Sequence, residues 1–321
     1  MMRRVVLAVA VSVLLLTGCG AQPIANQPVR AVEPLPPGAK ELTNPAKPAP
    51  ENCGDPTASL RPGALPSPGQ MPAGSTMQKI ALRGSLIVGV DQNTYKVGYR
   101  DPFSGQIEGF DIDIARAVAK AIFGDPNRIQ LRVLTSAQRV PALQDGTVDI
   151  VVRTMTITCA RLKQVAFSTV YYQANQRILA KKASGIGSAA NLNGKKVCAT
   201  SSSTSLGTIV AVAPKAKPVA ATDWTDCLVM LQQDQVDAVS TDDTILAGMA
   251  AQDRYTQVVG PSLAPEPYGI AVPLGKADMV RFVNGVLERI RADGTWQAAY
   301  DRWLAGLLGP VSGPPQPRYR G

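Results

Sequence analysis

The chain has 321 residues, of which 45% are hydrophobic, and its 33 basic and 24 acidic side chains give a net charge of +9. This size suffices for one large or two ordinary globular domains with buried cores. The chain contains no histidine, which removes the commonest general base and the Ser-His and Cys-His nucleophile arrangements, so ordinary hydrolase chemistry is disfavoured. The basic residues are scattered and not interleaved with aromatic residues, which argues against nucleic-acid binding.

The N-terminus has the pattern of a secretion signal. Arg3 and Arg4 precede an apolar run over residues 5–16, which is too short for a comfortable membrane span, and small residues lead from it to Cys19. The segment Leu-Thr-Gly-Cys resembles the lipobox of bacterial lipoproteins, in which the cysteine carries lipid. We therefore expect residues 1–18 to be a signal peptide and Cys19 to hold the chain on the outer face of the cell membrane, with an uncleaved anchor helix as the alternative.

Two segments rich in proline or glycine flank the central part of the chain. Residues 19–78 show no helical or strand periodicity and are expected to form an extended tether, and residues 309–321 a flexible tail. Cys53 interrupts the tether, which suggests a bond to the folded part. Once Cys19 is lipidated, four cysteines remain in an oxidising compartment and allow three pairings. None has the spacing of zinc ligands, so no metal is expected.

Between these segments, short β-branched runs alternate with amphipathic segments, and the pattern occurs twice. In the first unit we expect strands over residues 86–90, 129–134 and 148–152, and helices over 110–122, 137–144 and 160–165. In the second unit we expect strands over 194–199 and 236–240, and helices over 205–212, 224–232 and 243–251. A helix over 279–290 and a short helix with Trp303 follow. This alternation predicts two α/β units with parallel strands.

Polar side chains follow several of the expected strands, at the position where α/β sheets expose ligand sites. The residues concerned are Asp91, Arg139, Arg153, Thr154, Thr156, Arg161, Thr200, Thr204 and Asp242. An arginine fork pairs with a carboxylate, a loop of hydroxyl groups at a helix start suits an anion, and an aspartate can accept an ammonium group. Each residue type also has a purely structural use, as a helix N-cap or a solvated surface charge.

Several motifs occur in an order typical of one protein family. They are Gly109-Phe110-Asp111-Ile112-Asp113, Pro141-Ala142-Leu143-Gln144, Thr156-Ile157-Thr158 with Arg161, Asp237-Ala238-Val239 with Asp242, and Tyr268-Gly269-Ile270-Ala271. As a set, from Lys79 to Leu304, the chain resembles the solute-binding proteins, family 3, of polar-amino-acid ABC importers. Within the family it is most similar to the glutamine/glutamate-binding lipoproteins of the GlnH type in actinobacteria.

The resemblance implies a type II periplasmic-binding-protein-like α/β fold, in which two α/β sandwich lobes are joined by a two-strand hinge. Residues 79–180 and 267–308 would form lobe 1, and residues 181–266 would form lobe 2. It also implies two disulfides. Cys198–Cys227 would lie within the second lobe, and Cys53–Cys159 would fasten the tether to the first.

The resemblance also assigns roles around a bound amino acid. Arg161 would hold the α-carboxylate group, helped by Thr156 and Thr204. Asp242 would accept the α-ammonium group, together with a backbone carbonyl near Thr154. These roles come from the family, and the residues alone leave the structural alternatives open.

Three further positions bear on the ligand's side chain. Arg139 would meet a side-chain carboxylate, as in binders of acidic amino acids, and the segment that begins at Thr200 resembles the same subgroup. Arg153 stands where many relatives have alanine or glycine, and it could add a second positive group or point into solvent. The expected ligand is therefore glutamate or aspartate, with glutamine and asparagine as amide alternatives.

We thus expect a lipid-anchored binding protein outside the cytoplasm that captures an acidic or amide amino acid and delivers it to the permease of an ABC importer. No cofactor and no catalysis are expected. One alternative is an amino-acid sensor that reports to a membrane signalling receptor, since transport and sensing need the same pocket. A cyclohexadienyl-dehydratase-like enzyme is a further alternative, with less support.

Overall fold

A computed structural model describes residues 34–45, 47 and 52–320. The expected signal peptide, Cys19 and the first part of the expected tether lie outside the described residues. The chain divides into residues 1–34 and residues 35–321, and the elements below belong to the second of these units.

A five-stranded sheet forms the centre of what we call lobe 1. Its strands, in spatial order, are β7 (Ile129–Val133), β3 (Leu86–Val90), β8 (Ile150–Val151), β15 (Ala271–Pro273) and β9 (Val165–Phe167). β3 pairs in parallel with β7 and β8, whereas β15 is antiparallel to β8 and β9. The predicted parallel strands are therefore present, and a late segment of the chain returns to complete the sheet.

A six-stranded sheet forms the centre of lobe 2. Its strands, in spatial order, are β1 (Lys40–Glu41), β12 (Lys217–Ala221), β11 (Lys196–Thr200), β13 (Ala238–Asp242), β10 (Tyr172–Lys181) and β14 (Thr256–Tyr268). β11 is parallel to β12 and β13. A small antiparallel sheet contains β4 (Asn93–Thr94), β5 (Gly98–Arg100) and β6 (Ile107–Glu108), and β2 (Ser59–Leu60) pairs with β16 (Tyr319–Arg320).

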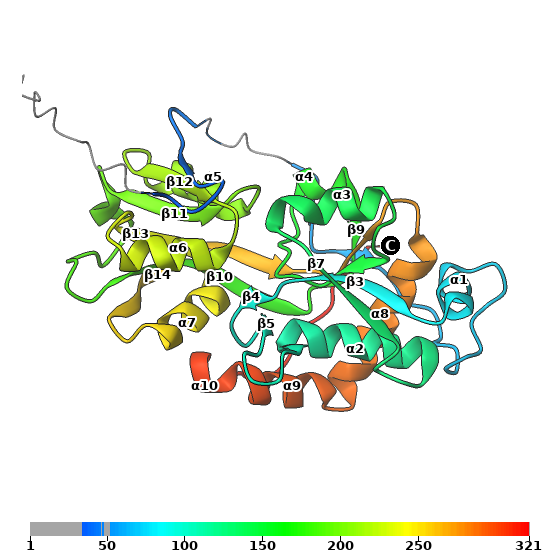
Figure 1. Ribbon diagram of the computed structural model, residues 1–321. Helices are drawn as coiled ribbons and strands as arrows, with labels where there is room; N and C mark the ends of the chain where they lie inside the picture. Colours follow the sequence, from blue (N-terminus) through cyan, green and yellow to red (C-terminus); the bar gives the residue numbers. More distant parts are fainter. Residues whose placement is uncertain (1–33, 46, 48–51, 321) are drawn as a thin grey trace, which may run out of the picture. The chain divides into compact units, whose positions relative to one another are not determined.

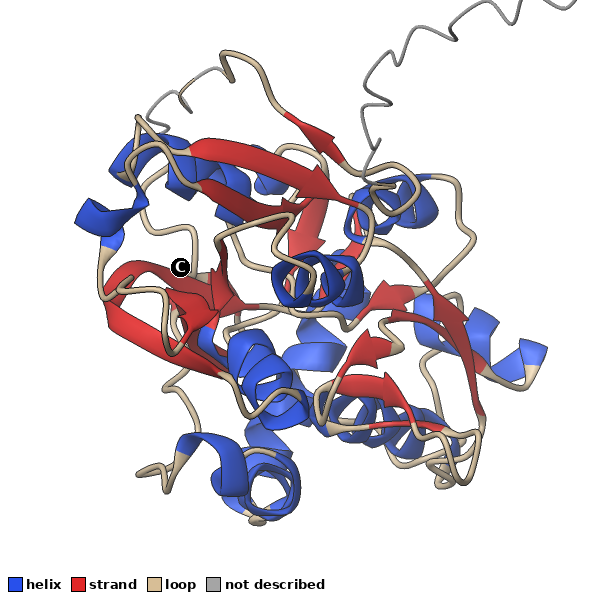
Figure 2. Ribbon diagram, turned by 60° about the vertical axis from the view of Figure 1, so that its left-hand side comes forward, coloured by secondary structure: helices blue, strands red, loops and turns tan. Residues whose placement is uncertain are grey.

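Helices flank the strands of both sheets (Figure 2). Lobe 1 carries α1 (Thr76–Arg83), α2 (Phe110–Phe123), η1 (Ser136–Gln138), α3 (Arg139–Gln144), α4 (Cys159–Leu162), α8 (Ala277–Ala292) and α9 (Thr295–Trp303). Lobe 2 carries η2 (Ala189–Leu192), α5 (Thr204–Val212), α6 (Trp224–Gln232) and α7 (Asp243–Gln252), and α10 (Ala305–Leu308) packs against α7. Within the described ranges, no helix combines the length and the apolar character needed to cross a membrane.

Helix α2 illustrates how the sequence pattern produces a buried face. Its apolar residues Phe110, Ile114, Val118 and Ile122 recur every four positions, and all four are at most 1% exposed. The helix ends at Gly124, whose φ of 77° lies in the left-handed region that glycine adopts without steric strain. The face packs into the core of lobe 1, and a separate core fills lobe 2.

Two long antiparallel strands join the lobes. β10 and β14 pair from Tyr172 with Tyr268 to Lys181 with Thr256, and they run from the six-stranded sheet toward lobe 1 (Figure 1). In lobe 1, the amide of Ile157 donates a hydrogen bond of 2.8 Å to the carbonyl of Pro267. The expected arrangement of two α/β lobes on a two-strand hinge is confirmed.

Both expected disulfides are present. Cys198 on β11 is bonded to Cys227 on α6, and Cys53 is bonded to Cys159, the first residue of α4. The first bond ties the central strand of lobe 2 to a helix that covers it. The second attaches the N-terminal segment to lobe 1.

The described part of the proline-rich N-terminal segment, expected to be an extended tether fastened at Cys53, also packs on both lobes at other points. β1 pairs with β12 at the edge of the lobe 2 sheet. Further along, the hydroxyl of Ser59 donates to the carbonyl of Phe167 at 2.7 Å, and the side-chain amide of Asn284 donates to the carbonyl of Leu60 at 2.7 Å. Proline lacks an N–H donor, but an extended segment can still supply carbonyls and side chains to a neighbouring surface.

The C-terminal segment also differs from the expected flexible tail. Tyr319 and Arg320 form β16 beside β2, and the hydroxyl of Tyr319 donates to Glu288 at 2.6 Å. Arg318 forms an ion pair of 3.1 Å with Asp55. Such a short segment is held by a few individual contacts, which leave no periodic pattern in the sequence.

Candidate functional site

A small cavity lies where the two lobes meet. The lining residues are Ser136, Arg139, Thr154, Thr156 and Arg161 from lobe 1 and Ser203, Thr204, Ser205, Trp224, Thr241, Asp242 and Ile245 from lobe 2. Hydroxyl groups and charged groups predominate in this set. The cavity therefore gathers strand ends and helix starts of both lobes, the position at which α/β sheets expose ligand sites.

Six of the nine predicted site residues line this cavity. They are Arg139, Thr154, Thr156, Arg161, Thr204 and Asp242. Ser136 and Trp224 line it as well, although sequence reasoning did not place them among the ligand contacts. The structure thus brings the predicted carboxylate-binding and ammonium-binding groups into one space, and their contacts with a ligand stay a prediction.

Arg161 extends from lobe 1 to the edge of lobe 2. The side chain of Thr158 caps helix α4 by accepting from the amide of Arg161 at 3.2 Å. The guanidinium group of Arg161 then donates to the carbonyl of Thr156 at 2.7 Å and to the carbonyl of Ser202, in lobe 2, at 3.3 Å. Burial lowers the pKa of Arg161, and the negative charges of Glu266 and Asp242 oppose this effect.

Asp242 is the last residue of β13 and faces the cavity from lobe 2. Its carboxylate accepts a hydrogen bond of 2.6 Å from the hydroxyl of Tyr268, which also lies 2.8 Å from the hydroxyl of Thr244. Burial raises the pKa of Asp242 well above its ordinary value, and the negative charge of Glu266 adds to this rise, whereas the bond from Tyr268 lowers the pKa. A cation in the cavity would stabilise the ionised form of Asp242.

Arg139 is buried at the start of α3. Its Nε donates to the carbonyl of Ser136 at 3.0 Å, and a terminal nitrogen donates to the carbonyls of Arg153 and Thr154 at 3.2 and 3.3 Å. Burial lowers the pKa of Arg139, and the positive charges of Arg161 and Arg153 lower it further. An anionic group in the cavity would relieve this accumulation of positive charge.

Thr154 has a backbone conformation that few residues other than glycine adopt. Its φ is 39°, and its amide donates to the carboxylate of Asp111 at 2.9 Å. The same carboxylate accepts from the hydroxyl of Tyr171 at 2.8 Å. Burial raises the pKa of Asp111 to about 7. These contacts fix the turn that presents Thr154 to the cavity.

Asp91, Arg153 and Thr200 do not line the cavity. Asp91 and Arg153 form an ion pair of 3.1 Å, and Arg153 also donates to the carbonyl of Leu134 and the hydroxyl of Ser136. The side chain of Arg153 is 0% exposed, so it does not point into solvent, one of the two orientations considered from the sequence. The hydroxyl of Thr200 donates to that of Ser136 at 3.1 Å, which links the two lobes.

Glu266 is a residue that sequence reasoning missed. It lies on β14, is 2% exposed, and accepts hydrogen bonds from the hydroxyls of Thr156 and Thr204. Burial raises the pKa of Glu266, whereas the two hydroxyl donors and Arg161 lower it. One feature of the sequence could have identified Glu266, namely that it is an acidic residue two positions before Tyr268, the first residue of a family motif.

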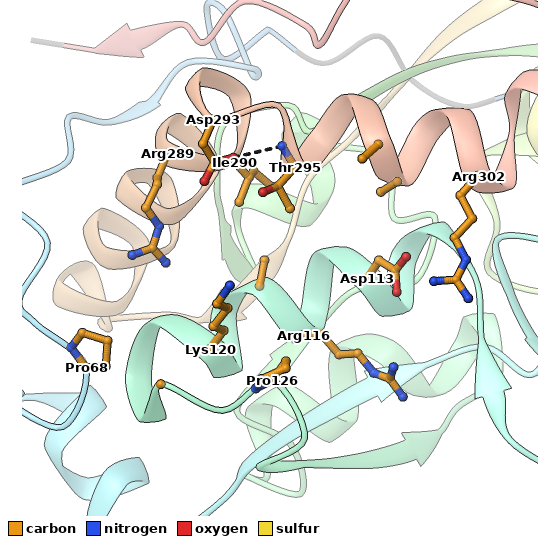
Figure 3. Close-up of a pocket in the computed structure, with 14 residues that line it drawn as sticks. Pro68, Asp113, Arg116, Lys120, Pro126, Arg289, Ile290, Asp293, Thr295 and Arg302 are labelled. Carbon is orange, nitrogen blue, oxygen red and sulfur yellow. Dashed lines mark hydrogen bonds between the residues drawn. The ribbon is translucent and has the colours of Figure 1, made fainter.

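A larger pocket lies elsewhere in lobe 1, and it shares no residue with the cavity between the lobes. Arg116 and Lys120 from α2, Arg289 from α8 and Arg302 from α9 surround it (Figure 3). Asp293 beside it accepts from the amide of Thr295. This pocket contains no predicted ligand residue, so we place the candidate site between the lobes.

Two α/β lobes, a two-strand hinge and a polar cavity between the lobes define a type II binding-protein fold. Residues 86–306 match the bacterial extracellular solute-binding proteins, family 3. The chain belongs to this family, so the expected family and its solute-binding function outside the cytoplasm are confirmed.

Similar proteins include two curated relatives and one solved structure. The chain is 40% identical over 230 residues to the ABC transporter glutamine-binding protein GlnH of Bacillus subtilis (strain 168), and the aligned region covers 71% of this chain and 84% of that protein. It is 28% identical over 249 residues to the glutamate/aspartate import solute-binding protein of Escherichia coli (strain K12), and the aligned region covers 74% of this chain and 82% of that protein. The solved structure is that of an ancestral amino acid-binding protein, a precursor of cyclohexadienyl dehydratase. It aligns with a TM-score of 0.65 at 34% identity, and the alignment covers 71% of this chain and 99% of that chain.

Proposed function

We propose that the protein captures a free amino acid in the cavity between the lobes. The observation that carries this proposal is that Arg161 and Asp242 line the same cavity from different lobes. A free amino acid has one negative and one positive pole, and each must be paired when it is removed from water, because an unpaired buried charge is strongly unfavourable. Arg161 pairs with the α-carboxylate and Asp242 with the α-ammonium group.

Arg139 supports glutamate or aspartate as the preferred ligand. It supplies a second buried guanidinium group to the cavity, which suits a side-chain carboxylate. The names of the two relatives above cover both glutamine and glutamate or aspartate, so glutamine and asparagine are the amide alternatives. Their neutral side chains would leave the positive charge of Arg139 less well compensated.

The test is a binding panel followed by calorimetry. The mature chain with Cys19→Ser is screened by thermal shift against the twenty amino acids, and the affinity for the ligands found is measured. We expect Arg161→Ala to abolish binding while the protein stays folded. Arg177→Ala is a matched control, because Arg177 also donates to a backbone carbonyl, that of Gly260, at 2.6 Å but does not line the cavity. Undiminished affinity in Arg161→Ala would refute the assignment.

We further propose that the loaded protein serves an ABC importer and that lipid on Cys19 holds it at the membrane. Deletion of the gene should then reduce uptake of labelled glutamate, and Cys19→Ala should move the protein from the membrane fraction to the medium. A sensor that reports to a membrane receptor would instead change signalling output and leave uptake unchanged.

The proposal includes no catalysis. The similarity to a precursor of cyclohexadienyl dehydratase makes cyclohexadienyl dehydratase activity the enzymatic alternative to examine. The chain has no histidine, and its paired charges suit a free amino acid that is bound and released unchanged. Product analysis after incubation with prephenate or arogenate distinguishes amino-acid binding from dehydratase activity, because formation of an aromatic product would contradict a purely binding role.

A further inference from the structure

The carboxylate of Glu266 connects the two lobes through a single oxygen atom. Oε2 of Glu266 accepts from the hydroxyl of Thr156 in lobe 1 and from the hydroxyl of Thr204 in lobe 2, the latter at 2.8 Å. The two hydroxyl oxygens are themselves 3.5 Å apart. Glu266 belongs to hinge strand β14, so a group on the hinge holds one donor from each lobe.

These donors are also the ones assigned to the ligand. Thr156, Thr204 and Arg161 form the proposed site for the α-carboxylate of the amino acid. Arg161 and Glu266 attract each other electrostatically, and the charge of Glu266 raises the pKa of Arg161 against the effect of burial. The carboxylate of Glu266 therefore lies among the groups that would bind the carboxylate of a ligand.

A threonine hydroxyl has one proton to donate. We propose that Glu266 is an internal competitor of the ligand, in that its carboxylate and the α-carboxylate of the captured amino acid take the hydroxyl protons of Thr156 and Thr204 in turn. This inference rests on the proposed function. Without an amino acid, Glu266 ties the lobes together through the two hydroxyls, and capture transfers both donors to the ligand.

The competition has an energetic consequence. The hydrogen bonds from Thr156 and Thr204 to Glu266 stabilise the unliganded protein, and binding forfeits them, so Glu266 weakens the affinity and favours release. Hydrogen bonds to a charged acceptor are stronger than neutral ones. A buried carboxyl group that loses its donors can take a proton and so avoid remaining as an unpaired charge. Burial already raises the pKa of Glu266.

The first test compares Glu266→Gln with the wild type by calorimetry and thermal unfolding. Glutamine keeps the shape and removes the charge, so we expect a melting temperature below that of the wild type without ligand and an affinity for glutamate that is about fivefold tighter or more. Glu108→Gln is a matched control, because Glu108 accepts a hydroxyl hydrogen bond from Tyr99 at 2.8 Å outside the cavity. A lower melting temperature with unchanged affinity would show a merely structural role, and weaker affinity would show a direct ligand contact; either result overturns the proposal.

The second test does not require a ligand. Small-angle scattering of the unliganded proteins should give a larger radius of gyration for Glu266→Gln than for the wild type and for Glu108→Gln, because the variant loses the charged group that holds a donor from each lobe, while the contacts of Arg161 with Ser202 and of Thr200 with Ser136 remain. Equal radii would overturn the proposal. If none of the twenty amino acids binds to the wild type, the proposed function fails, whereas the scattering comparison still reports on Glu266.

Discussion

Asp91 and Arg153 form an ion pair of 3.1 Å that is almost completely sealed from solvent, with side chains 3% and 0% exposed. The pair lies beside the candidate site, and neither residue lines the cavity. Asp91 follows β3 and Arg153 follows β8, and these strands are neighbours in the sheet. The two charges therefore neutralise each other and support the wall that carries Ser136 and Thr154.

Breaking this pair should affect stability more than binding. Asp91→Asn leaves the guanidinium group of Arg153 buried without its anion, and removal of one partner from a buried pair costs about 3–5 kcal/mol. We expect the free energy of unfolding in urea to fall by about that amount, while the affinity for glutamate changes little. Arg83→Gln is the control, because its pair with Asp149 is partly exposed. Loss of binding in a folded Asp91→Asn protein would instead make Asp91 a ligand contact.

Arg139 should determine the preference between acidic and amide ligands. We expect Arg139→Gln to weaken glutamate binding by about a hundredfold, which corresponds to the loss of a buried charge pair, and to weaken glutamine binding much less. Calorimetry with both amino acids measures the ratio of the two affinities. Equal losses for glutamate and glutamine would show that Arg139 does not meet the side chain.

The hydroxyl of Tyr268 should keep Asp242 ionised. Its hydrogen bond lowers the pKa of Asp242 against the strong upward effect of burial. In Tyr268→Phe that pKa rises, so a larger fraction of Asp242 is protonated at neutral pH and cannot pair with an ammonium group. We expect affinity at pH 7 to fall about tenfold, the effect of one hydrogen bond to a charged group, and to recover as the pH is raised. A loss that is independent of pH would contradict this account.

Asp111 should make stability depend on pH. Burial raises its pKa from the ordinary 3.8 to about 7 in the folded protein, so the unfolded state releases this proton at lower pH than the folded state. Linkage then requires the contribution of Asp111 to the free energy of unfolding to fall as pH rises from about 4 to about 7 and to level off above that range. Urea titrations of wild type and Asp111→Asn measure this contribution as their difference.

Asp113→Asn is the control for that experiment, because Asp113 lies on the same helix and accepts a hydrogen bond from the indole of Trp303. The difference between wild type and Asp111→Asn should shrink over the pH range in which the contribution falls. If it stays constant, Asp111 does not titrate differently in the two states.

Sequence periodicity predicted the elements that bury a regular face. The helix expected over residues 224–232 is α6, and the strand expected over residues 86–90 is β3, each with the expected bounds. Periodicity missed the elements whose burial is irregular. β14 is half-buried or exposed from residue 257 to residue 265 and buried at its end near Tyr268, because it is first an edge strand of the lobe 2 sheet and then enters the space between the lobes.

The rule that ligands bind at strand ends explains which cavity-lining residues the sequence predicted and which it missed. It identified Arg161, which comes after β8 in lobe 1, and Asp242, the last residue of β13 in lobe 2, and both line one cavity. It could not show that Asp91 and Arg153 pair with each other, because that depends on which strands are neighbours. It also missed Glu266, which is brought to the cavity by a hinge strand and not by a strand that leads into a helix.

The N-terminal segment limits how far the two halves of the molecule can separate. β1 is held on lobe 2, and its neighbour Leu42 donates an amide hydrogen bond to Pro218 of that lobe, whereas Cys53 is covalently bonded to lobe 1. Cys53 follows Leu42 by eleven positions (53 minus 42), and a fully extended chain advances at most about 3.6 Å per residue. While β1 stays paired, the two attachment points can never be more than about 40 Å apart. The length of the chain between Leu42 and Cys53 therefore sets an upper limit on how far the two lobes can open.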